Sequence, residues 1–407
     1  MKKIIHNLLA KASYLFSSDT GKVFIGVTVW QVLMTFIGTL YDTTLSNIFQ
    51  NPASPDQGHT LLSHTMYWDG GWYESILNGA YSDPSSAASV FYPVFPFCVW
   101  LIHTLSFGLI GDPGTGFIVN LLSLFFAVLA LVKIADHFVD KKYRWWIPIL
   151  FLTSPAAIFL HFFYTEAIFC ALAFWSYLFA LRRQWWQMAT FLALTAATRL
   201  PGILFVGLCA LEFFRSYNWR PRQILNRHFL WFLITPLGLT LYGLYLYIVR
   251  GDFLGMIHGY KLTDDWSYHV FHLNIFDTYY IGIYQLLDVF KSPIPFDEGQ
   301  SVNFFIPILS LIILTGASIY SLLRIRSKQI GIPLGIFGIV SVVFFSLNSD
   351  FVSIHRYILP TLVVYIATAH LASRRKWLHY LFYGAVYAGI LIQAYLYILY
   401  VNGYFAG

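Results

Sequence analysis

Residues 187–214 read QMATFLALTAATRLPGILFVGLCALEFF and decide how the chain is threaded through a membrane. The stretch is apolar, yet it is too short for two full crossings of about 20 residues each. A single crossing here would move every later loop to the side that its basic residues disfavour. We therefore predict two short helices, 187–198 and 201–214, hinged at Thr198-Arg199-Leu200-Pro201-Gly202. Proline and glycine interrupt a helix and leave backbone groups without helical hydrogen bonds. Such groups are tolerated where they line a cavity inside the protein.

The whole composition indicates a membrane protein, since 58% of the residues are apolar, 19% are aromatic and only 11% are charged. We predict an all-α polytopic protein with about ten or eleven transmembrane helices. The first candidate span, 23–45, has no small-residue cleavage site after it, so we expect an uncleaved anchor. The cysteines stand singly in apolar runs, which predicts neither a disulfide framework nor a zinc cluster. The basic residues are scattered between spans, so no nucleic-acid partner is expected.

Charge bias across the loops sets the predicted topology. The predicted spans are 23–45, 117–135, 147–163, 167–181, the pair 187–198 and 201–214, 229–249, 303–323, 330–347, 355–372 and 377–400. This segmentation places about twenty of the 25 Lys and Arg residues on the cytoplasmic side, with the N-terminus. The exceptions, on the outer side, are Arg199, Arg250, Lys261, Lys291 and Arg356. The short N-terminus and modest length favour a bacterial plasma membrane.

We expect a single transmembrane domain over 1–407, with a first external loop at 46–116 and a second external region at 250–302. Within the first loop, Tyr92-Pro93-Val94-Phe95-Pro96 opens an apolar stretch that ends at Ile110. A crossing there would move the basic 141–144 loop to the outside. We therefore predict a helix that lies in the outer interface or dips into it.

Ionisable residues from distant segments meet at one depth in this topology. They are Asp69, Glu166, Arg199, Lys261 and Arg356. Such groups are costly there and usually line a water-filled cavity or pair with one another, so the pattern predicts a functional site. Asp69 lies in the acidic, aromatic-flanked turn Tyr67-Trp68-Asp69-Gly70-Gly71-Trp72-Tyr73 of the first loop.

An ordered series of short motifs resembles the PIG-V family. The motifs are Trp68-Asp69, Phe91-Tyr92-Pro93-Val94-Phe95-Pro96, Ser154-Pro155 to Tyr164-Thr165-Glu166, Thr198-Arg199-Leu200-Pro201-Gly202, Gly251-Asp252-Phe253 with Trp266, and Arg356-Tyr357 with Pro360. Members of that family are GT-C-fold mannosyltransferases, and the eukaryotic ones add the second mannose to glycosylphosphatidylinositol. The resemblance implies transfer of a hexose, here mannose, from a polyprenyl-phosphate donor to a lipid-linked or surface glycan acceptor on the outer face. A separate cofactor is not expected.

The resemblance makes Asp69 the general base of an inverting transfer, and Glu166 a second acid that orients the acceptor or acts with Asp69. The departing lipid phosphate needs cations, and the candidates are Arg199, Arg356, Lys261 and His355. Aromatic residues expected to contact substrate are Trp68, Tyr73, Tyr92 and Tyr164. The external histidines match no metal-ligand spacing, so we expect no metal.

Each of these residues also has an ordinary structural interpretation. Asp69 would be a solvated loop acid, and Glu166 a carboxylate that favours a helix N-terminus. The arginines would contact lipid headgroups, or Arg199 would pair with Glu166. The aromatic side chains would form interfacial belts.

Two other functions stay open at the level of sequence. One is a transporter or flippase for a lipid-linked sugar or an anion. Transporters commonly carry internal repeats with broken helices in matching halves, whereas this sequence has one broken helix pair, which disfavours this alternative. The other is a noncatalytic scaffold, in which the outer acids and arginines would pair only with each other. An accessory subunit is possible but not implied by the sequence.

Overall fold

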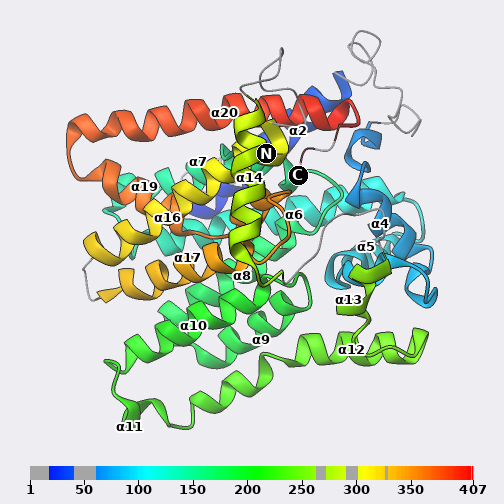
Figure 1. Cartoon of the computed structure of the whole chain (residues 1–407), viewed down its shortest axis with the longest axis horizontal. Helices are drawn as coiled ribbons and strands as arrows, with labels where there is room; N and C mark the ends of the chain where they lie inside the picture. The colour runs from blue at the N-terminus through cyan, green and yellow to red at the C-terminus, as the bar shows by residue number, and fades with distance from the viewer. Residues whose placement is uncertain are drawn as a thin grey trace, which may run out of the picture.

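The computed structural model describes residues 18–40, 61–262, 272–289, 301–325, 329–404 and 406, and within these ranges it contains helices and no strands (Figure 1). Five segments are long and apolar enough to cross a membrane. They are α2 (Asp19–Leu40), α6 (Asp112–Ala135), η7 with α12 (Phe229–Arg250), α16 (Ile306–Arg324) and η11 with α20 (Lys376–Val401). The prediction of an all-α polytopic membrane protein is thus confirmed.

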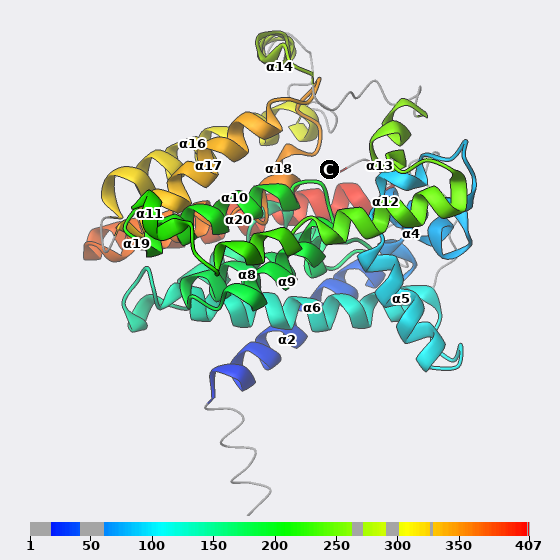
Figure 2. The same ribbon diagram turned by 90° about the horizontal axis from the view of Figure 1, so that it is seen from below.

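The other apolar segments form shorter helices around a buried centre. These are α5 (Val94–Leu105), α7 (Trp146–Leu152), α8 (Glu166–Leu181), α9 (Trp185–Ala196), α10 (Gly202–Ser216), α17 (Gly331–Phe345) and α19 (Val363–Ser373). Helix α8 packs against α6, α9 and α10, and most of its side chains are buried. Figure 2 shows α2 and α14 (Ile275–Val289) at opposite edges of the bundle, with α8 between them. Glu166, the first residue of α8, is buried, and a charged residue there needs partners.

The hinge predicted at Thr198–Gly202 is present between α9 and α10. A Cβ atom on Gly202 would come within 2.7 Å of the Thr195 carbonyl oxygen, so the two helices meet closely at this point. Glycine is needed for that approach. The turn places Arg199 between the ends of the two helices, beside the cavity described below.

Three predicted spans are interrupted rather than continuous. The span predicted at 147–163 is divided into α7 and the 3-10 helix η6 (Pro155–Leu160), and the one at 229–249 into η7 (Phe229–Ile234) and α12 (Leu237–Arg250). The span at 355–372 is divided into α18 (Ile354–Ile358) and α19. Each break coincides with a proline, which lacks an N–H donor and disfavours helix at the preceding residue. The prolines are Pro155, Pro236 and Pro360.

Basic loops gather at one end of the bundle. The Tyr143 hydroxyl lies 3.3 Å from His379 Nε2, which joins the 141–144 loop to the start of α20. Trp219 Nε1 donates to Gln329 Oε1 at 3.1 Å and joins the loops that follow α10 and α16. These loops lie on the left in Figure 1, whereas α4 (Asp69–Leu77), α5 and α13 (Gly255–His258) lie on the right. Their assignment to the cytoplasmic side remains a prediction.

The two regions predicted to be external pack against each other at the opposite end. Ser89 Oγ, in the 3-10 helix η4 (Ala87–Val90), donates to the Gly255 carbonyl at 2.8 Å, and the Tyr242 hydroxyl donates to the Ser89 carbonyl at 2.7 Å. Helix α14 was not predicted, since 250–302 was expected only as an external region. Its Thr278 Oγ1 donates to the Asn348 carbonyl at 2.9 Å, next to the candidate site. Residues of these regions outside the described ranges include Trp266 and Lys291.

Helix α20 packs closely at Gly389 against the segment that follows α7. A Cβ atom at this position would collide with the Thr153 carbonyl oxygen, and one turn later Gln393 Nε2 donates to the Leu152 carbonyl at 3.1 Å. Gly389→Ala is expected to destabilise the protein by about 1–3 kcal/mol through overpacking. Gly384→Ala is the matched control in the same helix, because nothing lies within 4 Å of its added carbon. Thermal unfolding in detergent should separate the two; equal midpoints would contradict this packing.

Candidate active site

Asp69 is the first residue of helix α4, and not part of an isolated turn. The chain enters the helix through Trp68, whose φ of 56° is in the left-handed region. The Asp69 N–H donates to the Tyr164 hydroxyl at 3.2 Å, and that hydroxyl donates to the Tyr67 carbonyl at 3.1 Å. Tyr164 therefore fixes the start of α4 against the segment that precedes α8.

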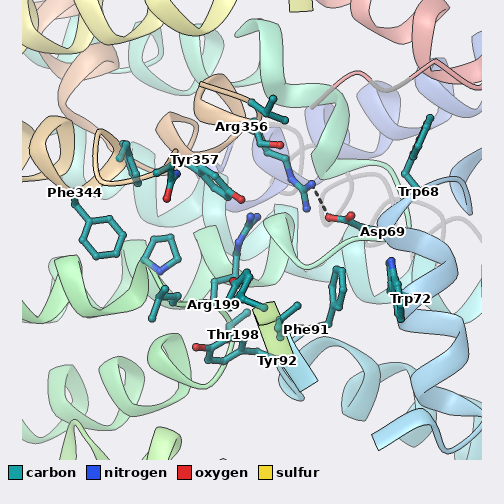
Figure 3. Close-up of a pocket in the computed structure, with 18 of the residues that line it drawn as sticks. Trp68, Asp69, Trp72, Phe91, Tyr92, Thr198, Arg199, Phe344, Arg356 and Tyr357 are labelled. Atoms are coloured by element: carbon teal, nitrogen blue, oxygen red, sulfur yellow. Dashed lines mark hydrogen bonds and ion pairs between the residues drawn. The ribbon is translucent and has the colours of Figure 1, made fainter. Parts of the chain in front are cut away.

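An ion pair holds the Asp69 carboxylate at the edge of a cavity. Arg356 Nη1 donates to Asp69 Oδ2 at 2.7 Å, and Figure 3 shows this contact between side chains from distant segments. The Asp69 side chain is 23% exposed, whereas that of Arg356 is 4% exposed. Among the described residues, nothing donates a hydrogen bond to the other oxygen, Oδ1, so a substrate hydroxyl can reach it.

Glu166 lies behind this pair and joins the two arginines. It is the first residue of α8, and its Oε1 accepts hydrogen bonds from Arg356 Nε and Arg199 Nη1. Its Oε2 is buried and has no partner among the described residues. Removing one ion of such a buried cluster leaves a charge uncompensated, which is costly. The structure therefore contains the pairing of Arg199 with Glu166 that the sequence left as an alternative.

Aromatic rings fix the position of both guanidinium groups. The Arg356 guanidinium carbon lies 4.6 Å from the Tyr164 ring centroid and 5.1 Å from that of Phe159. The Arg199 guanidinium lies 5.3 Å from the Tyr357 ring centroid. Cation–π contacts of this kind stabilise a cation that has left water.

Arg199 keeps unused hydrogen-bonding capacity. The only hydrogen bond from its side chain to the described residues is the one to Glu166, so Nε and Nη2 have no acceptor there. Arginine carries five N–H donors, and the side chain is 13% exposed beside the cavity. In Figure 3, Arg199 and Arg356 extend toward each other from opposite walls. An anion in the cavity could thus accept hydrogen bonds from Arg199 without breaking the cluster.

The cavity has a volume of about 590 Å³ and combines polar and aromatic walls. Among the predicted site residues it is lined by Trp68, Asp69, Tyr73, Tyr92, Arg199 and Arg356. Burial raises the pKa of the Tyr73 phenol, which keeps it a neutral hydrogen-bond donor. A volume of this size accommodates a small ligand.

Other lining residues were not singled out from the sequence. They are Tyr260, Asn348, Asp350 and Ser353, together with apolar residues such as Phe344 and Phe345. Trp72, Phe91 and Tyr357 also line the cavity; they occur in the motifs quoted above but were given no role there. One signal could have found some of them. The polar run Asn348-Ser349-Asp350 interrupts two apolar spans directly before Arg356. The other lining aromatics resemble ordinary interfacial residues in sequence.

Besides Glu166, three predicted residues lie away from the cavity walls. Lys261 is exposed in the 3-10 helix η8 (Gly259–Leu262), and its neighbour Tyr260 lines the cavity instead. His355 is buried, with Nε2 2.9 Å from the Ala406 carbonyl oxygen. Tyr164 lies behind the cavity wall and supports Arg356. In the described ranges, no group of three or more His, Cys, Asp or Glu residues is arranged to hold a metal ion.

No protein-family model and no curated protein matches the chain. Solved structures that resemble it include the oligosaccharyltransferase of Archaeoglobus fulgidus in the apo form, at 13% identity and a TM-score of 0.48 over 93% of this chain and 56% of that one. The same enzyme in complex with an inhibitory peptide and a dolichol-phosphate, called AglB, gives a TM-score of 0.49 at 13% identity over 93% and 56% of the two chains. The chain thus spans about half the length of these proteins. At such scores the likeness assigns neither a family nor an activity.

Proposed function

We propose that the protein is a membrane glycosyltransferase that moves a hexose from a polyprenyl-phosphate donor to an acceptor hydroxyl, with inversion. One observation carries this proposal. The Asp69 carboxylate is fixed at a cavity by Arg356 through one oxygen, while its other oxygen is available to a ligand. A base must lie within hydrogen-bond reach of the hydroxyl from which it takes a proton.

The proposed step is a direct displacement at the anomeric carbon. The acceptor oxygen forms a bond to that carbon as its proton passes to Asp69 Oδ1. The bond between the anomeric carbon and the phosphate oxygen breaks, and its electron pair leaves with the polyprenyl phosphate. The ion pair with Arg356 holds the Asp69 carboxylate in place for this step.

The donor phosphate is proposed to contact Arg199. Charge grows on the phosphate as it departs, and fixed cations in a site with little water stabilise such charge most strongly. Arg199 supplies free donors without a change of rotamer. Arg356 is committed to Asp69 and Glu166 and positions the base, although it also faces the cavity. Lys261 and His355, outside the lining, are weaker candidates.

Sugar identity rests on the motif resemblance to PIG-V mannosyltransferases, which implies mannose and a lipid-linked or surface glycan acceptor. Trp72 and Phe91 line the cavity with stacked rings whose centroids are 5.5 Å apart, and aromatic faces of this kind suit the apolar faces of sugars. We place the site on the outer face of a plasma membrane and treat 1–407 as one domain, as the charge bias suggests.

A noncatalytic scaffold is the second candidate, because the acids and arginines do pair with one another. A scaffold would not need the cavity beside them, nor the free Asp69 Oδ1 and Arg199 donors that face it. These features favour the enzyme.

The test is transfer by the purified protein in detergent or nanodiscs. Supplied with radiolabelled polyprenyl-phosphate mannose and a set of glycolipid and oligosaccharide acceptors, the protein should release polyprenyl phosphate and label an acceptor. Glucose and N-acetylglucosamine donors test the sugar. Failure with every donor and acceptor, by protein that still unfolds cooperatively, would favour the scaffold.

A further inference from the structure

A second cavity lies at the basic end of the bundle, far from Asp69 along the helices. Its volume is about 780 Å³, and it opens between the C-terminal ends of α16 and α19. The residues that line it are Tyr320, Leu323, Arg324, Leu371, Arg374 and Arg375. The neighbouring loop reaches Tyr143 through His379, which places the cavity among the other basic loops.

The three arginines of this cavity form no ion pair with the described residues. Two other arginines at the same end do form ion pairs, Arg144 with Asp19 and Arg215 with Glu212. Arg220, Arg222 and Arg227 also form none with the described residues, but they are exposed and line no common cavity. Cations near helix C-termini and on one side of a membrane are ordinary. Those rules do not explain why three guanidinium groups from two helices share a cavity without a carboxylate. Like charges at close range repel, so an anion between them would stabilise the arrangement.

A short hydrogen-bond chain adds a neutral donor to the cavity. Arg374 Nη2 lies 3.0 Å from His370 Nε2, and His370 Nδ1 lies 3.0 Å from the Tyr320 hydroxyl. Arginine can only donate, so Nε2 must accept and Nδ1 carries the proton that is donated to Tyr320. The hydroxyl proton of Tyr320 is then available to a ligand. Guanidinium groups with a hydroxyl donor match the oxygen atoms of a phosphate.

An exposed apolar strip leads away from this cavity along α16. Leu323 lines the cavity and is 56% exposed, and Ile319 and Ile312 on the same helix are 46% and 63% exposed. Their spacing places all three on one helix face. A molecule with an anionic head and hydrocarbon chains would find partners for both parts here.

We propose that this cavity binds the phosphodiester headgroup of an anionic phospholipid from the leaflet at the basic end, with the acyl chains along α16. Basic pockets between transmembrane helices suit such headgroups. This site is separate from the candidate active site and does not depend on the activity proposed for it.

The experiment measures phosphatidylglycerol retained by the full-length protein, using native mass spectrometry from a neutral detergent. The site variant is Arg324→Gln/Arg374→Gln/Arg375→Gln. The matched control is Arg220→Gln/Arg222→Gln/Arg227→Gln, which removes the same charge from exposed residues in another loop at this end. The control should bind like the wild type and the site variant about tenfold or more weakly. Phosphatidylcholine should bind all three proteins equally and weakly.

Equal losses in both triple variants would mean general attraction to the surface and would overturn the proposal, as would undiminished binding to the site variant. Inorganic phosphate at millimolar concentration should not displace the lipid. Full displacement would assign the cavity to free phosphate instead. Tyr320→Phe, which removes one hydroxyl and no charge, should weaken binding a few-fold, and this milder variant gives a readout should the triple variant fold poorly.

Discussion

Asp69→Asn is expected to abolish most transfer from the lipid donor while the protein stays folded. Asparagine keeps the shape of the side chain and can still accept a hydrogen bond from Arg356, but it cannot take up the proton of the acceptor hydroxyl. General-base catalysis contributes about 10²–10⁴-fold to a rate, so kcat should fall by that factor with little change in KM for the donor. Steady-state kinetics with labelled donor measures both.

Glu74→Gln is the control for this variant. Glu74 lies in the same helix and does not line the cavity, so the same change from acid to amide there should leave kcat within about twofold. Normal turnover by Asp69→Asn would remove Asp69 as the base. Equal losses in the two variants would show that charge near α4, and not proton transfer, determines the rate.

Arg356→Met is expected to destabilise the protein more than other single changes at the site. Methionine fills similar space between Tyr164 and Phe159 but leaves Asp69 without its partner and Glu166 with one arginine in place of two. Breaking a buried pair in this way costs about 3–5 kcal/mol. Thermal unfolding in detergent should show a large fall in midpoint, and transfer should fall with it because the base loses its support.

Arg199→Gln is the matched comparison. This variant leaves Glu166 paired with Arg356, so the midpoint of unfolding should fall less than in Arg356→Met. Donor affinity and turnover should nevertheless fall, and by more than this smaller loss of stability would explain. The double variant Arg356→Met/Glu166→Gln should be less destabilised than the sum of its single changes, because the carboxylate and the guanidinium are removed together. Additive effects would contradict the ion cluster.

The sequence predicted the convergence of distant residues because charge in a membrane protein is scarce and costly. Five residues were expected at one depth from the predicted topology, and the structure joins Asp69, Glu166, Arg199 and Arg356 through hydrogen bonds. The fifth, Lys261, is exposed and lies outside this cluster. The hinge at Thr198–Gly202 followed from the length of its segment. Hydropathy does not specify which acid meets which arginine, so the bridging position of Glu166 emerged only in three dimensions.

Other features were missed for local reasons. The average hydropathy of the sequence stays high across Pro155, Pro236 and Pro360. Three helices that these prolines interrupt were therefore predicted as continuous spans. Helix α14 has mixed composition, and its packing on the connection between α17 and α18 is a tertiary effect. Tyr164 was expected to contact substrate, but it lies behind the cavity wall, because sequence cannot distinguish a ring that faces a ligand from one that supports an arginine.

The proposed activity requires a donor held between Arg199 and Asp69. A structure determined by electron cryomicroscopy with a non-hydrolysable polyprenyl-phosphonate mannose tests it most directly. We expect the phosphonate within hydrogen-bond distance of Arg199 and the anomeric carbon open toward Asp69 Oδ1. Density for the donor outside this cavity, or an Asp69 side chain turned into bulk solvent away from both arginines, would contradict the account.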